Sequence, residues 1–155
     1  LNQANQLNKL IESIQKNTLE PERLILEFNE SAFSKNNEQA LKGLRKLKAA
    51  GVKLALDDYG TGQSSLNFLH GYPFEFIKLD RSFIRSLNNA KQLSLVKALH
   101  DLGENFGYRL VAEGIESEEM LLKLQSVGCE YGQGYHISRP QRMAEYTHSK
   151  KKHYA

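Results

Sequence analysis

Asp57 and Asp58 are adjacent carboxylates that follow directly on the apolar run VKLAL at residues 52–56. When both are ionised they repel each other, and removing both from water requires a compensating cation. Side-chain packing therefore gives little reason for such a pair. A strand that ends in these two residues is expected to present them to a divalent metal ion, which oxygen ligands suit.

Polar side chains also follow the later apolar runs. Lys78 and Asp80 are two residues apart in FIKLD, so a strand would point both to the same face, where they could form an ion pair. A simple salt bridge at a strand end explains this spacing equally well. Glu113 follows LVA directly and is hard to explain by packing, whereas Glu116 could merely open the next helix.

Three further residues complete the candidate set. Glu27 lies inside the first apolar run, where it could be buried against a cation, and Glu30 lies just past its end, where metal ligands are expected. Gln133 has a glycine on each side, which indicates either close approach of another group or a bend in the strand. Carboxylates, one lysine and an amide, without histidine, suit Mg²⁺ or Mn²⁺.

This set of residue types favours metal-dependent hydrolysis of a phosphodiester. Two divalent ions about 3.5–4 Å apart can bind both the attacking water and the leaving oxygen. Lys78 would orient the water or offset charge on the phosphate, and Glu113 would help to remove a proton. The histidines lack zinc-ligand spacing, and no serine or cysteine stands in a nucleophile motif such as G-x-S-x-G.

The secondary-structure elements that must position these residues are strands and helices, which alternate along the chain. Apolar segments that each run into polar residues are separated by stretches of helical spacing, which predicts an α/β fold of parallel strands covered by helices. The expected strands are LILEFNES, VKLALDD, FEFIKLD, YRLVAEGIE and CEYGQGYHIS. Their spacing is close to the roughly 31 residues per unit of a (βα)₈ TIM-like barrel, whose active sites lie at the carboxyl ends of the strands. At 155 residues, the chain would form a partial barrel of about five βα units.

Helix signals fall between these strands. We expect a helix at residues 37–50, a short helix that Ser64 or Ser65 caps, and a helix that begins after Ser117. A longer helix should turn Leu93, Val96, Leu99 and Phe106 inward and end at Gly107. Residues 141–155 are expected to hold a terminal helix and a flexible basic tail.

Bulk composition restricts the function classes. The net charge is +3, 40% of the residues are hydrophobic, and no apolar stretch approaches 18 residues. We therefore expect neither DNA binding nor membrane contact from this segment. The single cysteine, Cys129, cannot form an internal disulfide and favours a buried thiol and a cytoplasmic location, a membrane tether being left to sequence outside this chain.

Four segments, in this order and at this spacing, resemble the EAL domain family: LALDDYGTGQSSLNFL, FIKLDRSFI, LVAEGIES and GCEYGQGYHISRP. The resemblance covers nearly the whole chain, and we interpret residues 1–155 as the C-terminal part of an EAL domain that begins after the Glu-Ala-Leu strand. It implies a modified (βα)₈ barrel and hydrolysis of bacterial cyclic di-GMP to linear pGpG with Mg²⁺ or Mn²⁺. It also implies a homodimer in the complete domain.

Matched position by position, the resemblance assigns roles to individual residues. It implies metal binding by Glu30, Asp57, Asp58 and Glu113. It implies catalytic roles for Lys78, Asp80, Glu113, Glu116 and Gln133. The loop that couples the metal site to the dimer in this family matches Gly60, Thr61, Gly62, Gln63, Ser64 and Ser65.

The chain departs from the family pattern at three matched positions. Asn29, Tyr59 and Gln63 stand where the family usually has Thr, Phe and Tyr. Since strands that supply metal and substrate contacts precede the matched part, we expect this segment alone to be inactive. The alternative is a catalytically inactive EAL-like module that binds cyclic di-GMP or a protein partner.

Overall fold

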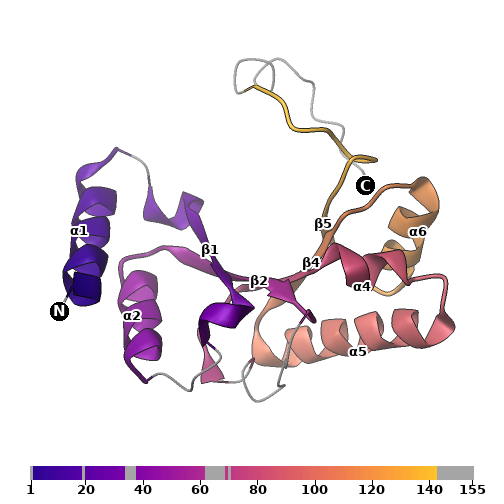
Figure 1. Ribbon diagram of the computed structural model, residues 1–155, viewed down its shortest axis with the longest axis horizontal. Coiled ribbons are helices and arrows are strands. Elements are labelled where there is room, and N and C mark those ends of the chain that lie inside the picture. The colour runs from indigo at the N-terminus through magenta and orange to yellow at the C-terminus, as the bar shows by residue number, and fades with distance from the viewer. Residues whose placement is uncertain (1, 19, 34–37, 62–68, 70, 143–155) are drawn as a thin grey trace.

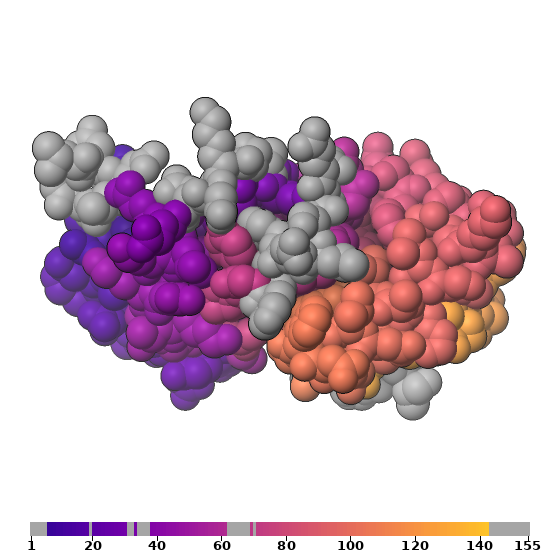
Figure 2. Space-filling model, turned by 90° about the horizontal axis from the view of Figure 1, so that it is seen from below, coloured from indigo at the N-terminus to yellow at the C-terminus, as the bar shows by residue number. Residues whose placement is uncertain are grey.

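The computed structural model describes residues 2–18, 20–33, 38–61, 69 and 71–142, and its centre is a single sheet of five parallel strands in sequence order (Figure 1). The strands are β1 (Ile25–Asn29), β2 (Lys53–Tyr59), β3 (Phe76–Leu79), β4 (Arg109–Glu113) and β5 (Tyr131–Gln133). Every expected strand is present, so the prediction of an α/β partial barrel with about five units is confirmed. The space-filling view shows the N-terminal and C-terminal parts of the chain at opposite ends of the molecule (Figure 2).

In the described part, helices follow β1, β3 and β4, as the crossover connections between parallel strands require. The α-helices are α1 (Asn2–Lys16), α2 (Glu38–Ala49), α4 (Arg81–Arg85), α5 (Ala90–Phe106) and α6 (Glu118–Ser126), and the 3₁₀ turns are η1 (Pro21–Arg23) and η2 (Glu30–Phe33). None of the helices in this described part is both long enough and apolar enough to cross a membrane.

The helix boundaries follow their capping residues. The Ser117 side chain accepts a hydrogen bond from the Met120 amide at the start of α6, as the sequence predicts. Gly107 ends α5 with φ 79°, a left-handed conformation that glycine adopts without steric cost. Phe106, by contrast, is 47% exposed, so its expected inward position is wrong. The buried face of α5 runs through Val96, Leu99 and Gly103 and ends where Tyr108 packs against Gly103, one turn before Phe106.

Two further expectations need correction or stay open. The α4 helix was not predicted, because its five residues are too few to show a helical period. The Asp pair does not end its strand, since β2 continues to Tyr59. The expected short helix after Ser64 or Ser65 lies outside the described residues, as does nearly all of the expected terminal helix and tail at 141–155.

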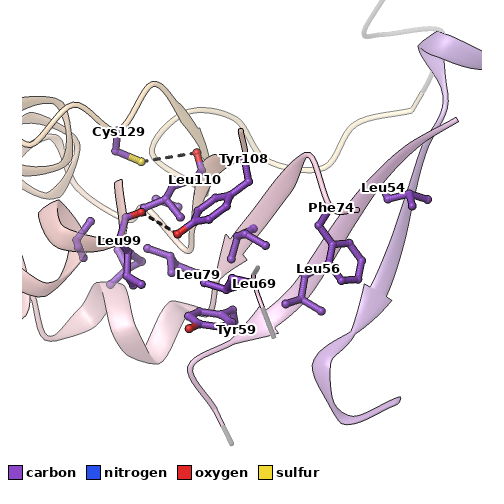
Figure 3. Close-up of a cluster of buried hydrophobic side chains, with 14 of the residues drawn as sticks. Leu54, Leu56, Tyr59, Leu69, Phe74, Leu79, Leu99, Tyr108, Leu110 and Cys129 are labelled. Carbon is purple, nitrogen blue, oxygen red and sulfur yellow. Dashed lines mark hydrogen bonds between the residues drawn. The ribbon is translucent and has the colours of Figure 1, made fainter. Parts of the chain in front are cut away.

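The hydrophobic core lies on the outer face of the sheet, under the helices. Leu54, Leu56, Ile77 and Leu79 lie on this face of β2 and β3 and are at most 1% exposed. Figure 3 shows this cluster continuing to Cys129, whose thiol faces the Leu110 carbonyl. The prediction of a buried thiol is confirmed, and burial raises the pKa of Cys129.

The strand register places the polar candidates on the other, inner face. Asn29 pairs with Asp57 across β1 and β2, and Glu113 pairs with Gln133 across β4 and β5. Partner residues in parallel strands project to the same face, and so do residues two apart on one strand. The inner face near the carboxyl ends of the strands therefore carries a single group of polar side chains.

Candidate active site

An irregularity in β2 brings both aspartates of the Asp57–Asp58 pair to one side. Neighbouring strand residues normally point to opposite faces. Here the pairing with β3 shifts register between Leu56 and Tyr59, and Asp58 has φ 57°, the one positive φ at a non-glycine residue in the described part. Aspartate is among the few residues that tolerate this conformation. The left-handed residue turns the second carboxylate back toward the first.

Asp57, Asp58 and Glu113 form a three-carboxylate cluster. Each offers an oxygen, and these oxygens lie within 4.8 Å of one another, with all three residues partly buried. The Asp58 amide donates a hydrogen bond of 3.1 Å to Asp57 Oδ1, which fixes that carboxylate. Oxygen donors at this separation suit a hard divalent cation.

Glu30, the fourth expected ligand, lies outside this cluster of described residues. It opens the 3₁₀ turn η2, and its Oε2 accepts a hydrogen bond of 3.4 Å from the Gly60 amide. Its carboxylate therefore contacts the start of the loop that follows the aspartates. A metal-binding role for Glu30 stays a prediction.

Lys78 lies beneath the cluster and is 7% exposed. Its Nζ is 2.7 Å from Glu27, 3.0 Å from Asp57 and 2.7 Å from Glu113. Burial lowers the pKa of the ammonium, but hydrogen bonds to these three carboxylates outweigh burial and raise it above its ordinary value. Lys78 therefore stays protonated at neutral pH and can stabilise negative charge but cannot act as a base.

Glu113 is partly buried, and one of its carboxylate oxygens accepts hydrogen bonds from two donors. Lys78 Nζ and Gln133 Nε2 both reach Oε1, the latter at 2.8 Å. Burial raises the pKa of Glu113, and although Lys78 acts in the opposite direction the net shift is upward. A carboxylate whose pKa is raised holds a proton more readily, which suits a general base.

Two residues of β1 complete the site, and sequence reasoning left both without a firm role. Glu27 forms an ion pair with Lys78, and the Asn29 amide donates a hydrogen bond to Asp58 Oδ2. Both lie on the inner face because they are two residues apart on one strand. The spacing of two residues was the signal in the sequence that places Glu27 and Asn29 on the same face. Only the register of β1 against β2 shows that this is the inner face of the sheet.

The predicted catalytic acids Asp80 and Glu116 have other partners. β3 ends at Leu79, so Asp80 caps α4 and its Oδ1 accepts from the Ser82 amide at 2.9 Å. The hydroxyl and amide of Ser82 lower the pKa of Asp80. The ion pairs of Lys78 in the described part go to other carboxylates, so the expected Lys78–Asp80 pair is wrong. Glu116 pairs with Arg85 at 3.2 Å. Catalytic roles for Asp80 and Glu116 stay predictions.

A pocket of about 740 Å³ opens beside Glu113 and Gln133. Arg81 and Arg139 are among its lining residues, and the Arg139 guanidinium lies 5.0 Å from the ring centroid of Tyr135. Guanidinium groups bind phosphates through paired hydrogen bonds, and an exposed aromatic ring can stack on a planar base. The pocket can therefore accept an anionic ligand next to the carboxylate cluster.

The loop after the aspartates is described only at its start. Gly60 has φ 98°, and the Thr61 hydroxyl donates a hydrogen bond of 2.9 Å to the Asp58 carbonyl. These contacts hold the chain as it leaves the Asp pair. The predicted coupling residues Gly62, Gln63, Ser64 and Ser65 lie outside the described residues.

Comparison with known proteins gives a consistent result. The family model described as EAL domain matches residues 1–140. A cyclic di-GMP phosphodiesterase, PdeB of Shewanella oneidensis, is 37% identical over 121 residues, which cover 77% of this chain and 14% of PdeB.

Solved structures agree in fold. The PaMucR phosphodiesterase in complex with c-di-GMP superposes with a TM-score of 0.82 at 34% identity, over 90% of this chain and 57% of that one. A manganese and cyclic di-GMP complex of Klebsiella pneumoniae BlrP1 gives a TM-score of 0.81 at 33% identity, over 88% of this chain and 35% of that one. The chain thus spans a minor part of PdeB and little more than half of the PaMucR structure.

Proposed function

The chain belongs to the EAL domain family, and from that membership we propose that the protein containing it hydrolyses cyclic di-GMP to linear pGpG with two Mg²⁺ or Mn²⁺ ions. The observation that supports this most directly is the convergence of Asp57, Asp58 and Glu113 to within 4.8 Å. The names of PdeB and PaMucR, and the ligands in the titles of the solved structures, support the substrate. The proposal concerns the complete domain.

The residues present fit divalent cations by the chemistry of their donors. Asp57, Asp58 and Glu113 would hold the metal ions through carboxylate oxygens. When bound, such ions stabilise charge on the phosphate and lower the pKa of a coordinated water. Metal binding would also relieve the repulsion among the three carboxylates, which Lys78 alone offsets only in part.

The protein's own side chains supply the remaining chemistry. Lys78, held protonated by its carboxylate partners, offsets negative charge that develops on the phosphate and orients the attacking water. Glu113, where it does not hold a metal ion, accepts the proton that the attacking water releases, and Gln133 fixes its Oε1. Arg81 and Arg139 bind phosphate oxygens of the dinucleotide from the adjacent pocket.

The test uses the full protein that contains this chain. Asp57→Asn should weaken Mn²⁺ binding by about 10-fold or more, and Lys78→Met should lower kcat by roughly 10²–10³-fold, as loss of a preorganised charge does. Asp101→Asn is the matched control, because Asp101 is an exposed carboxylate on α5 that pairs with Lys97. Calorimetry measures Mn²⁺ affinity, and chromatography of the dinucleotide products measures turnover.

The outcomes separate the candidate functions. Mn²⁺-dependent formation of pGpG that Asp101→Asn leaves unchanged and that Asp57→Asn and Lys78→Met both lower supports the proposal. Binding of cyclic di-GMP without turnover overturns it in favour of the non-enzymatic module, and absence of both binding and turnover leaves a protein-interaction role. A homodimer, a cytoplasmic location and the inactivity of this segment alone stay predictions, which sedimentation, fractionation and assay of the 155-residue chain would test.

A further inference from the structure

The short helix α4 contacts two turns beside the carboxylate cluster. One follows the Asp57–Asp58 pair at the end of β2, and the other follows Glu113 at the end of β4. The helix follows β3, which lies between β2 and β4 in the sheet. We infer that α4 is a spacer that sets the separation between the Asp57–Asp58 pair and Glu113, and that Phe83 is its positioning residue. The consequence for metal binding depends on the proposed function, whereas the spacing itself does not.

The first contact is between Phe83 and Gly60. A methyl group built on Gly60 would lie 2.9 Å from Phe83 Cδ2, so the ring lies directly against the Gly60 backbone. Gly60 comes two residues after Asp58 and has φ 98°. Any side chain at this position would displace either the ring or the loop. Phe83 therefore limits how far the end of β2 can move toward α4.

The second contact is between Arg81 and Gly114. A methyl group on Gly114 would lie 2.5 Å from Arg81 Cβ, and Gly114 itself directly follows Glu113 with φ 72°. The Arg85 guanidinium, one turn further along α4, bonds Glu116 at 3.2 Å. The turn after β4 therefore lies against α4 at both ends of the helix.

A spacer must itself be fixed, and α4 is held at both ends. Asp80 caps its first turn, and the Asp80 amide donates a hydrogen bond of 3.4 Å to the Tyr59 carbonyl at the end of β2. Ile84 is fully buried in the core. These contacts give Asp80 a positioning role that does not require its carboxylate to touch metal or substrate.

Truncation of Phe83 tests this inference in the full protein. Phe83→Ala should raise amide hydrogen exchange, measured by mass spectrometry without metal, in peptides covering residues 57–61 and also in those covering 113–116. It should weaken Mn²⁺ binding by about 10-fold, as loss of groups that orient metal ligands does. Phe83→Leu, which keeps most of the bulk, should restore both properties. Phe106→Ala is the matched control, because Phe106 is an exposed phenylalanine at the end of α5.

Each outcome decides one point. Exchange that rises in both segments with Phe83→Ala, and in neither with Phe106→Ala, supports the spacer. Exchange that rises in only one segment, or uniformly over the whole protein, overturns it. Unchanged Mn²⁺ affinity in Phe83→Ala overturns the effect on the metal site and leaves the proposed function intact. A wild-type protein that binds no Mn²⁺ refutes the proposed function, while the exchange data still decide the spacer.

Discussion

At the residue scale, Asp58 has a strained backbone conformation and also contributes a carboxylate to the three-carboxylate cluster. Its φ of 57° is unusual for a side chain other than glycine, and it lets neighbouring carboxylates share one face. The left-handed conformation costs roughly 1–2 kcal/mol for ordinary L-residues and less for aspartate, whose side chain can hydrogen-bond locally. Strain of this kind is typical of functional sites.

Replacing Asp58 separates this strain from the charge. We expect Asp58→Gly to be more stable than Asp58→Ala by about 1 kcal/mol, because both remove the carboxylate but only glycine adopts a positive φ freely. Urea unfolding with a chelator present measures the difference. The same pair at Glu104, an exposed position within α5, should give the reverse order, since alanine favours helix over glycine. Equal stability of the two Asp58 variants would contradict a strained backbone.

Sequence reasoning found the charged site residues near the carboxyl ends of the strands and misjudged those whose position depends on an exact strand end. Asp57, Lys78 and Glu113 were identified because their charges interrupt apolar runs. The pairing of Lys78 with Asp80 failed because β3 stops at Leu79, and the chain direction changes at the next residue. Glu27 stayed ambiguous because its partner is 51 residues away in the chain.

At the element scale, α5 is joined to β4 by Tyr108. Its hydroxyl donates a hydrogen bond of 3.0 Å to the Leu99 carbonyl in the middle of α5, and its ring is 3% exposed (Figure 3). A methyl group on Gly103 would lie 2.6 Å from the Tyr108 carbonyl oxygen, so the end of α5 closely approaches the residue that precedes β4. Burial, and to a lesser degree Tyr59, raises the pKa of Tyr108 to about 12.

This shift predicts a loss of stability at alkaline pH. In the unfolded chain Tyr108 loses its proton near pH 10.0, whereas in the folded protein it keeps the proton until about pH 12. Between these values the unfolded state binds fewer protons, so the free energy of unfolding falls as pH rises, by at most about 1.4 kcal/mol per pH unit.

Tyr108→Phe isolates this effect from other groups that titrate at alkaline pH. Urea unfolding at intervals from pH 9 to 11.5 should show a shallower decline in the variant than in the wild type. Below pH 10 the variant should be less stable by about 1 kcal/mol, because it lacks the hydrogen bond to Leu99. Parallel declines in the two proteins would show that Tyr108 ionises equally in both states.

The elements differ in how far their sequences specify them. The strands and the three longer helices that follow them were predictable from apolar period and capping residues such as Ser117 and Gly107. α4 was not, because its formation depends on Asp80 capping and on Ile84 entering a core made by distant strands. A five-residue helix is too short to show a helical period in the sequence, so it cannot be predicted without knowledge of those neighbours.

At the scale of the whole molecule, the sheet ends in two strands, β1 and β5, that each pair on one side only within the described part. Figure 1 shows β1 and β5 at opposite sides of the sheet. Apolar side chains remain accessible on the inner face of both strands, where Ile25 is 44% and Tyr131 37% exposed. Unpaired strand edges with accessible apolar side chains favour pairing with another chain.

We therefore expect the isolated 155-residue chain to self-associate through its edge strands. Ile25→Lys should shift the chain toward monomer, because a lysine on an edge strand opposes strand addition. Leu122→Lys is the matched control, since Leu122 is 57% exposed on the helix α6 and not on an edge strand. Sedimentation velocity at tens of micromolar measures the distribution. A wild-type chain that sediments as a monomer, or an equal response to both substitutions, would exclude the open edges as the site of association.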